Sequence, residues 1–234
     1  MRQSIKLETQ DEHIIYGYLD EPEIKTDKLI IFVHGMSGSS DEHHYYNAVN
    51  FFNAEGFATY RINLYARANK GRQLSESSIA THVQDVNQVV EYFSKSYSQI
   101  YLVGHSLGCI AVIDAEHSKL KQIILWEPTV GFNDLAEKNA TYDEATNKYI
   151  LHWGLEFSVS AELFKVWKNF EPQNYINKVP ANSIFIFGEL SKYFAVWRPY
   201  LNNFNPVVIK GADHAFLGLE QERELFVTTL KLLQ

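Results

Sequence analysis

The sequence contains very little cysteine and no long apolar run. Cys109 is the only cysteine in 234 residues, which excludes an internal disulfide and favours a reducing, cytoplasmic environment. No apolar stretch approaches the length of a membrane span, and residues 1–6 lack the apolar run of a signal peptide. We therefore expect a cytoplasmic chain without export or membrane insertion.

Basic residues are also in short supply. The 21 Lys and Arg residues are outnumbered by 28 Asp and Glu residues, and the net charge of −7 argues against nucleic acid as the main partner. The histidines show neither H-E-x-x-H nor cysteine spacing, so no metal site is expected. No G-x-G-x-x-G or P-loop pattern occurs, so no cofactor is expected either. The expected partner is a small-molecule substrate, and a homodimer stays open.

Strand-like and helix-like segments alternate along the chain. With 46% hydrophobic and 21% charged residues, the composition fits one globular domain over residues 1–234. Strands are predicted at Ser4–Glu8, Ile14–Leu19, Leu29–Val33, Phe57–Asn63, 99–105, Gln122–Trp126, Ser183–Phe187 and Pro206–Lys210. Helices are predicted at Asp41–Asn53, Ser78–Tyr97, 107–118 and Glu222–Leu233. This alternation predicts an α/β fold with a mostly parallel sheet, in which ligands bind outside the carboxyl ends of the strands.

Residues 131–179 break the alternation. The segment is too long for a crossover and holds helix-like pieces rich in aromatic residues. We interpret it as a helical insertion that forms a lid over the face where the strands end. Trp153, Phe157 and Trp167 are the candidates for substrate contact, although packing of the insertion onto the sheet would also explain such aromatics.

Gly104-His105-Ser106-Leu107-Gly108 follows an apolar, strand-like run and precedes a helix-like segment. A G-x-S-x-G pattern at such a junction is typical of a nucleophile elbow. The serine sits on a tight, strained turn, and neighbours without a Cβ let the chain pass close to it. The following helix directs free N–H groups at an anion formed on attack. The alternative is a turn whose serine merely caps a helix.

The elbow is one of several motifs that follow one another in order. His34–Gly38 follows the third predicted strand, and Gly211–His214 follows the last one. With these motifs the chain resembles the α/β-hydrolase superfamily over nearly its whole length. The resemblance implies a central, mostly parallel sheet flanked by helices. The finer similarity is to small bacterial esterases and lysophospholipase-like members, on Val33-His34-Gly35, Asn63-Leu64-Tyr65 and Leu125-Trp126-Glu127-Pro128.

In an enzyme of this kind, Ser106 would be the nucleophile. A serine hydroxyl is a poor nucleophile by itself and needs a base within hydrogen-bond reach. His214 is the expected base, because it lies just past the last strand on the same face as the elbow. The oxyanion hole would use the backbone N–H groups of Met36 and Leu107. We expect His34 to brace its turn and to take no part in catalysis.

The acid of the triad is where this chain departs from the family. The usual aspartate lies three residues after the glycine that ends the penultimate strand, and here that position holds Ser191. A serine cannot carry the charge that stabilises the imidazolium. Glu127 is the preferred substitute, since haloalkane dehalogenases and pancreatic lipases carry their acid at the end of that strand. Glu189 is the alternative, and the absence of an effective acid is a third possibility. Asp213 is adjacent to the histidine and cannot easily reach its ring.

These features predict a serine hydrolase that cleaves esters or thioesters of apolar acyl groups through an acyl-enzyme. Two alternatives stay open: a binding protein that kept the fold and lost turnover, and a hydrolase of C–C or amide bonds. Arg67, Lys70 and Arg72 form a basic loop after the fourth predicted strand. They could attract a carboxylate or phosphate of the substrate, although a solvated loop is the simpler explanation.

Overall fold

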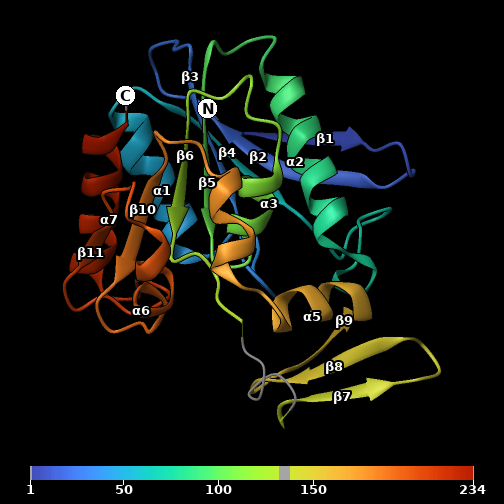
Figure 1. Cartoon of the computed structure of the whole chain (residues 1–234). Coiled ribbons are helices and arrows are strands. Elements are labelled where there is room, and N and C mark those ends of the chain that lie inside the picture. The colour runs from blue at the N-terminus through green and yellow to red at the C-terminus, as the bar shows by residue number, and fades with distance from the viewer. Residues whose placement is uncertain (1, 132–137, 234) are drawn as a thin grey trace.

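The computed structural model describes residues 2–131 and 138–233, and its centre is an eight-stranded sheet (Figure 1). The strands are β1 (Arg2–Glu8), β2 (Ile14–Asp20), β3 (Lys28–Val33), β4 (Ala58–Asn63), β5 (Gln99–His105), β6 (Gln122–Trp126), β10 (Ile184–Gly188) and β11 (Val207–Ile209). They stand in the order β1-β2-β4-β3-β5-β6-β10-β11. β2 is antiparallel to both β1 and β4, and all other pairs are parallel. The predicted, mostly parallel sheet is therefore confirmed.

Helices cover both faces of this sheet (Figure 1). One face carries α1 (His43–Ala54) and α7 (Leu219–Leu232), and the other carries α2 (Ile79–Phe93) and α3 (Gly108–Asp114). Successive side chains of a strand point to opposite faces, so β3 supplies both cores. Leu29 and Ile31 pack with α2 and α3, whereas Ile30 and Phe32 pack with α1 and α7. Burial on both faces explains why this strand reads as a continuous apolar run.

The predicted helices and strands of the core are present, with ends that differ by at most four residues. Three short elements were not predicted, namely the 3-10 helices η1 (Leu74–Glu76) and η4 (Arg198–Tyr200) and the helix α6 (Tyr193–Trp197). Elements this short carry too few residues for a hydrophobic period to be visible. None of the helices in residues 2–131 and 138–233 is long and apolar enough to cross a membrane.

The described part of the insertion combines a small three-stranded antiparallel sheet with short helices, so the predicted helical lid over 131–179 is corrected. Its elements are β7 (Ala140–Asp143), β8 (Lys148–His152), β9 (Glu156–Ser160), α5 (Ala161–Lys168), η2 (Pro172–Asn174) and η3 (Ile176–Lys178). The two hairpins are closed at Asn147 and Gly154, which have φ of 54° and 76°. Asn and Gly enter this left-handed region at lower cost than other residues, and this makes them hairpin signals. Residues 132–137 of the predicted insertion lie outside the described residues.

Residues 138–168, which we call the cap, lie at the edge of the main sheet where its parallel strands end (Figure 1). The Ser160 hydroxyl donates a hydrogen bond to the carbonyl of Ser77 and accepts one from the Leu163 N–H at 3.0 Å, which caps α5. Lys148 Nζ donates to the Ser75 hydroxyl at 3.2 Å. These bonds hold the cap against the segment around η1, beside the face where ligands of such sheets bind.

Candidate active site

Ser106 occupies the turn between β5 and α3, as the sequence predicts. Its φ of 53° is unusual for a residue with a side chain, and a strained conformation of this kind typically marks a functional site. The flanking glycines allow the turn. A Cβ on Gly104 would lie 2.9 Å from Cys109 Cα, and one on Gly108 would lie 2.4 Å from the carbonyl oxygen of His34. The elbow therefore needs glycine at both positions because the backbone passes too close for a larger residue.

The neighbouring strand β6 holds this turn and presents a carboxylate. The Ser106 N–H donates to the carbonyl of Trp126 at 3.1 Å, and the Ser106 carbonyl accepts from the Thr129 N–H at 3.2 Å. Glu127, between these two residues, has a φ of 47° and a fully buried side chain. Its Oε1 accepts the backbone N–H of Gly188 at the end of β10. Two strained residues on adjacent strand ends thus point their side chains toward one place.

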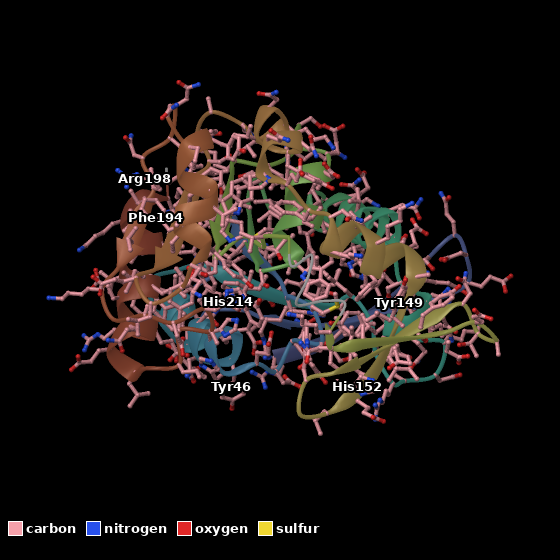
Figure 2. All side chains as sticks on the ribbon, turned by 60° about the horizontal axis from the view of Figure 1, so that its bottom comes forward. Tyr46, Tyr149, His152, Phe194, Arg198 and His214 are labelled. Carbon is pink, nitrogen blue, oxygen red and sulfur yellow. The ribbon has the colours of Figure 1, made fainter. Side chains whose placement is uncertain are left out.

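His214 joins these two side chains. Its Nε2 lies 3.0 Å from Ser106 Oγ, and its Nδ1 lies 3.0 Å from Glu127 Oε2. Because an ionised carboxylate can only accept, Nδ1 carries the proton and leaves Nε2 free to accept the serine proton. Figure 2 shows His214 between Phe194 of α6 and the cap residues Tyr149 and His152. Ser106, His214 and Glu127 therefore form a continuous hydrogen-bonded chain with the geometry of a catalytic triad.

The loop after β3 lies directly against Ser106. A Cβ on Gly35 would be 3.0 Å from Ser106 Cβ. His34 fixes the loop: its Nδ1 donates to the Gly35 carbonyl at 2.9 Å, and its Nε2 accepts the Leu64 N–H at 3.0 Å. Burial lowers the pKa of His34 to about 4, so the ring stays neutral and keeps both bonds at neutral pH. The bracing role predicted for His34 agrees with this geometry.

The backbone N–H groups of Met36 and Leu107 are the predicted oxyanion donors. Within residues 2–131 and 138–233, neither N–H donates to a protein acceptor. Met36 follows the glycine that touches Ser106, and Leu107 follows Ser106 itself. Both N–H groups are therefore available beside the nucleophile, where an oxyanion would form.

Comparison with known families gives a direct result for this chain. Residues 24–175, well over half of the sequence, match the model of the family described as "Serine aminopeptidase, S33". The chain belongs to this family. The α/β-hydrolase superfamily and fold predicted from the motifs are confirmed. No curated protein matches the chain significantly.

Solved structures resemble this S33-family hydrolase along its whole length. Est1E from Butyrivibrio proteoclasticus with ferulic acid bound has 19% identity and a TM-score of 0.77, with 97% of this chain and 98% of that chain covered. The α/β hydrolase GrgF from Penicillium sp. sh18 has 13% identity and a TM-score of 0.76, with 100% and 98% covered. A putative hydrolase from Agrobacterium vitis S4 has 13% identity and a TM-score of 0.71, with 100% and 99% covered. At these identities the likeness shows a shared fold.

Two buried histidines of this S33-family hydrolase were not singled out from the sequence. His105 Nε2 donates to the backbone carbonyl of His214 at 2.9 Å, and the two rings lie 5.0 Å apart. His44 lies behind His105, with its ring 4.8 Å away. Burial lowers the pKa of both rings, that of His44 to about 3, so both are neutral under the triad. In the sequence, the one indication of a role for His105 was its position inside the elbow motif, and His44 had none.

The other carboxylates near the triad are engaged elsewhere. Glu189, the predicted alternative acid, accepts the Gly211 N–H at 2.9 Å. Asp213 Oδ1 accepts two backbone N–H groups of its own loop, those of Ala215 and Leu217, each at 3.1 Å. The hydroxyl of Ser191 accepts the Tyr193 N–H at 3.1 Å. Among the described residues, Glu127 is the carboxylate that reaches His214.

The three cap aromatics predicted to contact substrate have different positions. Trp167 is 3% exposed and packs in the interior of the cap, so its predicted substrate contact is corrected. Trp153 is 41% exposed in the hairpin turn, with its ring 5.1 Å from that of Trp167. Phe157 lines a cleft of about 790 Å³ between the cap and the core. Only this third aromatic lies where a ligand near the loop after β3 could touch it.

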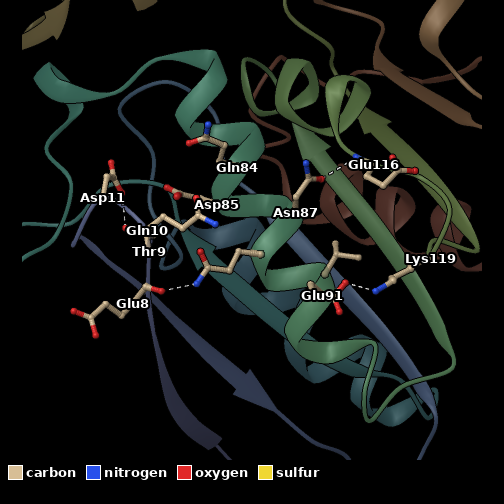
Figure 3. Close-up of a pocket in the computed structure, with 12 residues that line it drawn as sticks. Glu8, Thr9, Gln10, Asp11, Gln84, Asp85, Asn87, Glu91, Glu116 and Lys119 are labelled. Atoms are coloured by element: carbon tan, nitrogen blue, oxygen red, sulfur yellow. Dashed lines mark hydrogen bonds and ion pairs between the residues drawn. The ribbon is translucent and has the colours of Figure 1, made fainter.

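This cleft starts at the loop that carries Met36. Its walls are residues 37–39, 63, 65–67, 73–75, 150 and 156–158. A second cavity, of about 770 Å³, lies between the β1–β2 turn and α2 (Figure 3) and contains no residue of the triad. Its side chains hydrogen-bond within the protein: Lys119 pairs with Glu91, and Gln88 donates to the Glu8 carbonyl at 2.6 Å. Neither cavity is lined by a triad residue, but Tyr65 of the first cleft donates to the carbonyl of Gly35, the glycine that lies against Ser106, so this cleft is the candidate substrate site.

The three residues of the predicted basic loop, Arg67, Lys70 and Arg72, have different surroundings in the structure. The Arg72 side chain is 5% exposed and pairs with Asp11 at 2.7 Å and with Asp85 at 3.4 Å. Lys70 Nζ lies 3.7 Å from a Glu8 carboxylate oxygen. Substrate attraction by Arg72 and Lys70 is thus corrected to structural pairing, and Arg67 alone lines the cleft. Across residues 2–131 and 138–233, no group of three or more His, Cys, Asp or Glu side chains could hold a metal ion.

Proposed function

We propose that this hydrolase is a serine esterase that cleaves small carboxylic esters through an acyl-enzyme. The observation that supports it is the chain of hydrogen bonds from Ser106 Oγ through His214 to Glu127, each about 3.0 Å long. It combines a nucleophile, a base within reach and a buried carboxylate that orients the base. The structural neighbour Est1E, which was solved with ferulic acid bound, shares the fold.

The reaction follows from the positions of these groups. Ser106 Oγ attacks the ester carbonyl carbon while its proton passes to His214 Nε2. The N–H groups of Met36 and Leu107 stabilise the resulting oxyanion. The tetrahedral intermediate collapses, the C–O bond to the alcohol breaks, and the alcohol leaves with the proton from His214. Water then attacks the acyl-enzyme by the same route and releases the acid, while Glu127 stabilises the imidazolium in both halves.

The cleft argues for a polar or aromatic acyl group over a long aliphatic chain. Phe157 is its one aromatic side chain from the cap, and most of the other lining residues carry hydroxyl, amide or charged groups. A purely aliphatic chain would leave those polar groups dehydrated and unpaired, which costs free energy. The same triad would also accept thioesters, because the leaving group contributes little to the site described above.

Labelling with a fluorophosphonate tests this proposal. The wild-type protein is expected to react rapidly at Ser106, with the adduct located by mass spectrometry, and Ser106→Ala is expected to react not at all. Glu127→Gln should slow both labelling and 4-nitrophenyl acetate hydrolysis by roughly 10²- to 10⁴-fold, since the imidazolium loses its counter-charge. Glu189→Gln is the matched control and should change either rate by less than about twofold.

Three outcomes would contradict the proposal. Absence of labelling in the wild-type protein would favour the binding-protein alternative, because a working triad reacts with the probe. Normal labelling in Glu127→Gln would show that the carboxylate contact does not support catalysis and would place the acid elsewhere. Rapid labelling with amide hydrolysis in place of ester hydrolysis would move the protein to peptidase or amidase chemistry on the same triad.

A further inference from the structure

Arg67 is the one cation of the loop after β4 that the fold leaves unpaired. Arg72 is held by Asp11 and Asp85, and Lys70 lies at Glu8. Among the described residues, no carboxylate lies within 4.0 Å of the Arg67 guanidinium, and this side chain makes no hydrogen bond to the protein. Its five N–H donors are therefore available to a ligand.

Arg67 lies in the wall of the cleft that begins at the loop after β3. Ser37 and Gly38 line the same cleft, and they follow the predicted oxyanion residue Met36 in sequence. The Tyr65 hydroxyl, also in the wall, donates to the carbonyl of Gly35 at 3.0 Å. Gly35 in turn lies against Ser106, so an acyl group bound at Ser106 and extended past this loop would run along the wall that carries the guanidinium.

Some of the other polar groups of the cleft are hydrogen-bonded within the protein, and others still have donors free. Asn63 is bonded through both side-chain atoms to Ser40, and Gln73 Nε2 donates to the carbonyls of Ala66 and Gly71. In the described part of the chain, the hydroxyls of Ser37 and Ser158 make no side-chain hydrogen bond. Among the described residues of the lining, the donors left unused are the Arg67 guanidinium and the hydroxyls of Ser37, Ser39, Ser75 and Ser158, a set that suits an anionic acceptor.

The charges around the cleft also favour an anionic ligand. Glu156 is the one carboxylate in its lining, and its side chain is 74% exposed and bonded to His152 Nδ1 at 3.0 Å. Lys148 borders the cleft through its 3.2 Å bond to Ser75 and pairs with no described carboxylate. In a chain of net charge −7, this wall carries the Arg67 guanidinium without an ion-pair partner among the described residues.

We propose that Arg67 binds a free carboxylate at the far end of the acyl group, so that the substrates are monoesters of dicarboxylic acids. The planar guanidinium can grip both oxygens of a carboxylate at once, which orients the substrate as well as binding it. The hydroxyls of Ser37 and Ser158 complete the contact. This inference rests on the proposed esterase function and adds the substrate class.

The test compares two series of 4-nitrophenyl esters. The anionic series carries succinyl, glutaryl and adipoyl groups with the second carboxyl free, and the neutral series carries butanoyl, pentanoyl and hexanoyl groups. We expect wild-type kcat/KM to favour the anionic member of at least one pair about 10- to 100-fold, with an optimum chain length that measures the reach to Arg67. Arg67→Gln should abolish that preference and leave the neutral series within about twofold.

Two matched variants sharpen the comparison. Lys70→Gln removes the same charge from the same loop but outside the cleft, so the preference should persist. Glu156→Gln removes the competing anion and should increase the preference for the anionic series. Equal loss on both series in Arg67→Gln, or an equal loss in Lys70→Gln, would overturn the assignment, because the effect would then be structural or long-range.

A binding measurement separates this inference from the esterase proposal. Ser106→Ala protein cannot turn over the ester, so calorimetry with monomethyl glutarate reports binding alone. Affinity that falls about tenfold or more in Ser106→Ala/Arg67→Gln supports the carboxylate site even if no ester is hydrolysed. Affinity unchanged by the second substitution refutes the site, whereas hydrolysis of the neutral esters by the wild-type protein would still support the esterase.

Discussion

Ser106 and Glu127 share a backbone conformation that residues with side chains rarely adopt, at φ of 53° and 47°. Each such residue costs of order 1–3 kcal/mol, and it persists only where the surrounding structure fixes it. Here the fixing contacts are backbone hydrogen bonds, from Thr129 to Ser106 and from Glu127 to Ile186. Seven described non-glycine residues have a positive φ, and Ser106 and Glu127 are the two of them whose side chains hydrogen-bond to His214.

Gly108→Ala tests how tightly the elbow packs on the loop after β3. The new Cβ would lie 2.4 Å from the His34 carbonyl oxygen and 2.6 Å from that of Val33, and backbone cannot move aside cheaply. We expect a loss of about 1–3 kcal/mol in the free energy of unfolding, measured by urea titration, and a lower kcat. Gly218→Ala is the control, because its Cβ meets only the mobile end of Gln221. An equally stable Gly108→Ala protein would contradict this close packing.

His105→Phe tests whether the hydrogen bond from His105 fixes the loop that carries His214. The ring volume is kept, but the bond from His105 Nε2 to the His214 carbonyl is lost. We expect kcat to fall about tenfold with KM little changed, because His214 then spends less time in line with Ser106. His105→Gln should recover part of the loss, since its amide can donate a similar bond. Equal activity in wild type and His105→Phe would remove this positioning role.

At the scale of elements, Arg72 joins three segments that are distant in sequence. Its guanidinium contacts Asp11 in the turn between β1 and β2 and Asp85 on α2, from the loop after β4. Burial raises the pKa of Asp85 to about 6, although the nearby Arg72 charge opposes this shift. The pair is thus a buried junction, which explains why a residue predicted to meet substrate is 5% exposed.

Arg72→Met should destabilise this junction by about 3–5 kcal/mol, because it leaves Asp85 buried without a partner. The measurement is urea unfolding at pH 7, with Lys70→Gln as a surface control expected to change stability by less than about 0.5 kcal/mol. The double variant Arg72→Met/Asp85→Leu should recover most of the loss. A loss in the single variant no larger than that of the control would show that the pair contributes little.

The cap shows which part of the architecture the sequence does not specify clearly. The core strands were predicted because each has a continuous apolar run between turn residues, as at Leu29–Val33. β9 alternates polar and apolar residues strictly, which is a strand pattern, whereas β8 holds three successive apolar residues, and Asn147 and Gly154 mark the turns of the hairpins. The turn residues and the alternation in β9 therefore give the insertion a three-stranded sheet in addition to α5.

The candidate site was predicted from local motifs where the motif itself fixes the geometry. Ser106 and His214 follow directly from the elbow and the end of the last strand. Glu127 could be favoured over Glu189 but not assigned, because the direction of each side chain depends on how β6 and β10 end. The pairing of Arg72, which separates it from Arg67, depends on contacts across 13 and 61 residues that no local pattern contains.

At the scale of the whole molecule, several buried histidines make stability depend on pH. Burial lowers the pKa of His34 to about 4 and those of His44 and His82 to about 3. In the unfolded chain each titrates near pH 6.5, so below that pH the unfolded state binds more protons than the folded state. Stability is therefore independent of these groups above about pH 7 and falls as the pH drops toward 4.

His82→Phe should make this acid destabilisation less steep. Each such histidine contributes a slope of up to about 1.4 kcal/mol per pH unit to the free energy of unfolding between roughly pH 6 and 4. The variant should therefore take up about one proton fewer than the wild type when it unfolds in this range. The measurement is the free energy of unfolding by urea at a series of pH values. Above pH 7 the curves of variant and wild type should run parallel, and identical slopes below pH 6 would refute the buried neutral state.

The triad draws its members from unequal distances along the chain. Ser106 and Glu127 directly follow β5 and β6, which pair with each other, whereas His214 follows the last strand and reaches them across 108 and 87 residues. Closing that long loop is the entropically expensive step of assembly. Enzyme activity thus reports completion of the chain's final docking step: during refolding or synthesis, turnover begins only when the C-terminal strand and its loop have arrived.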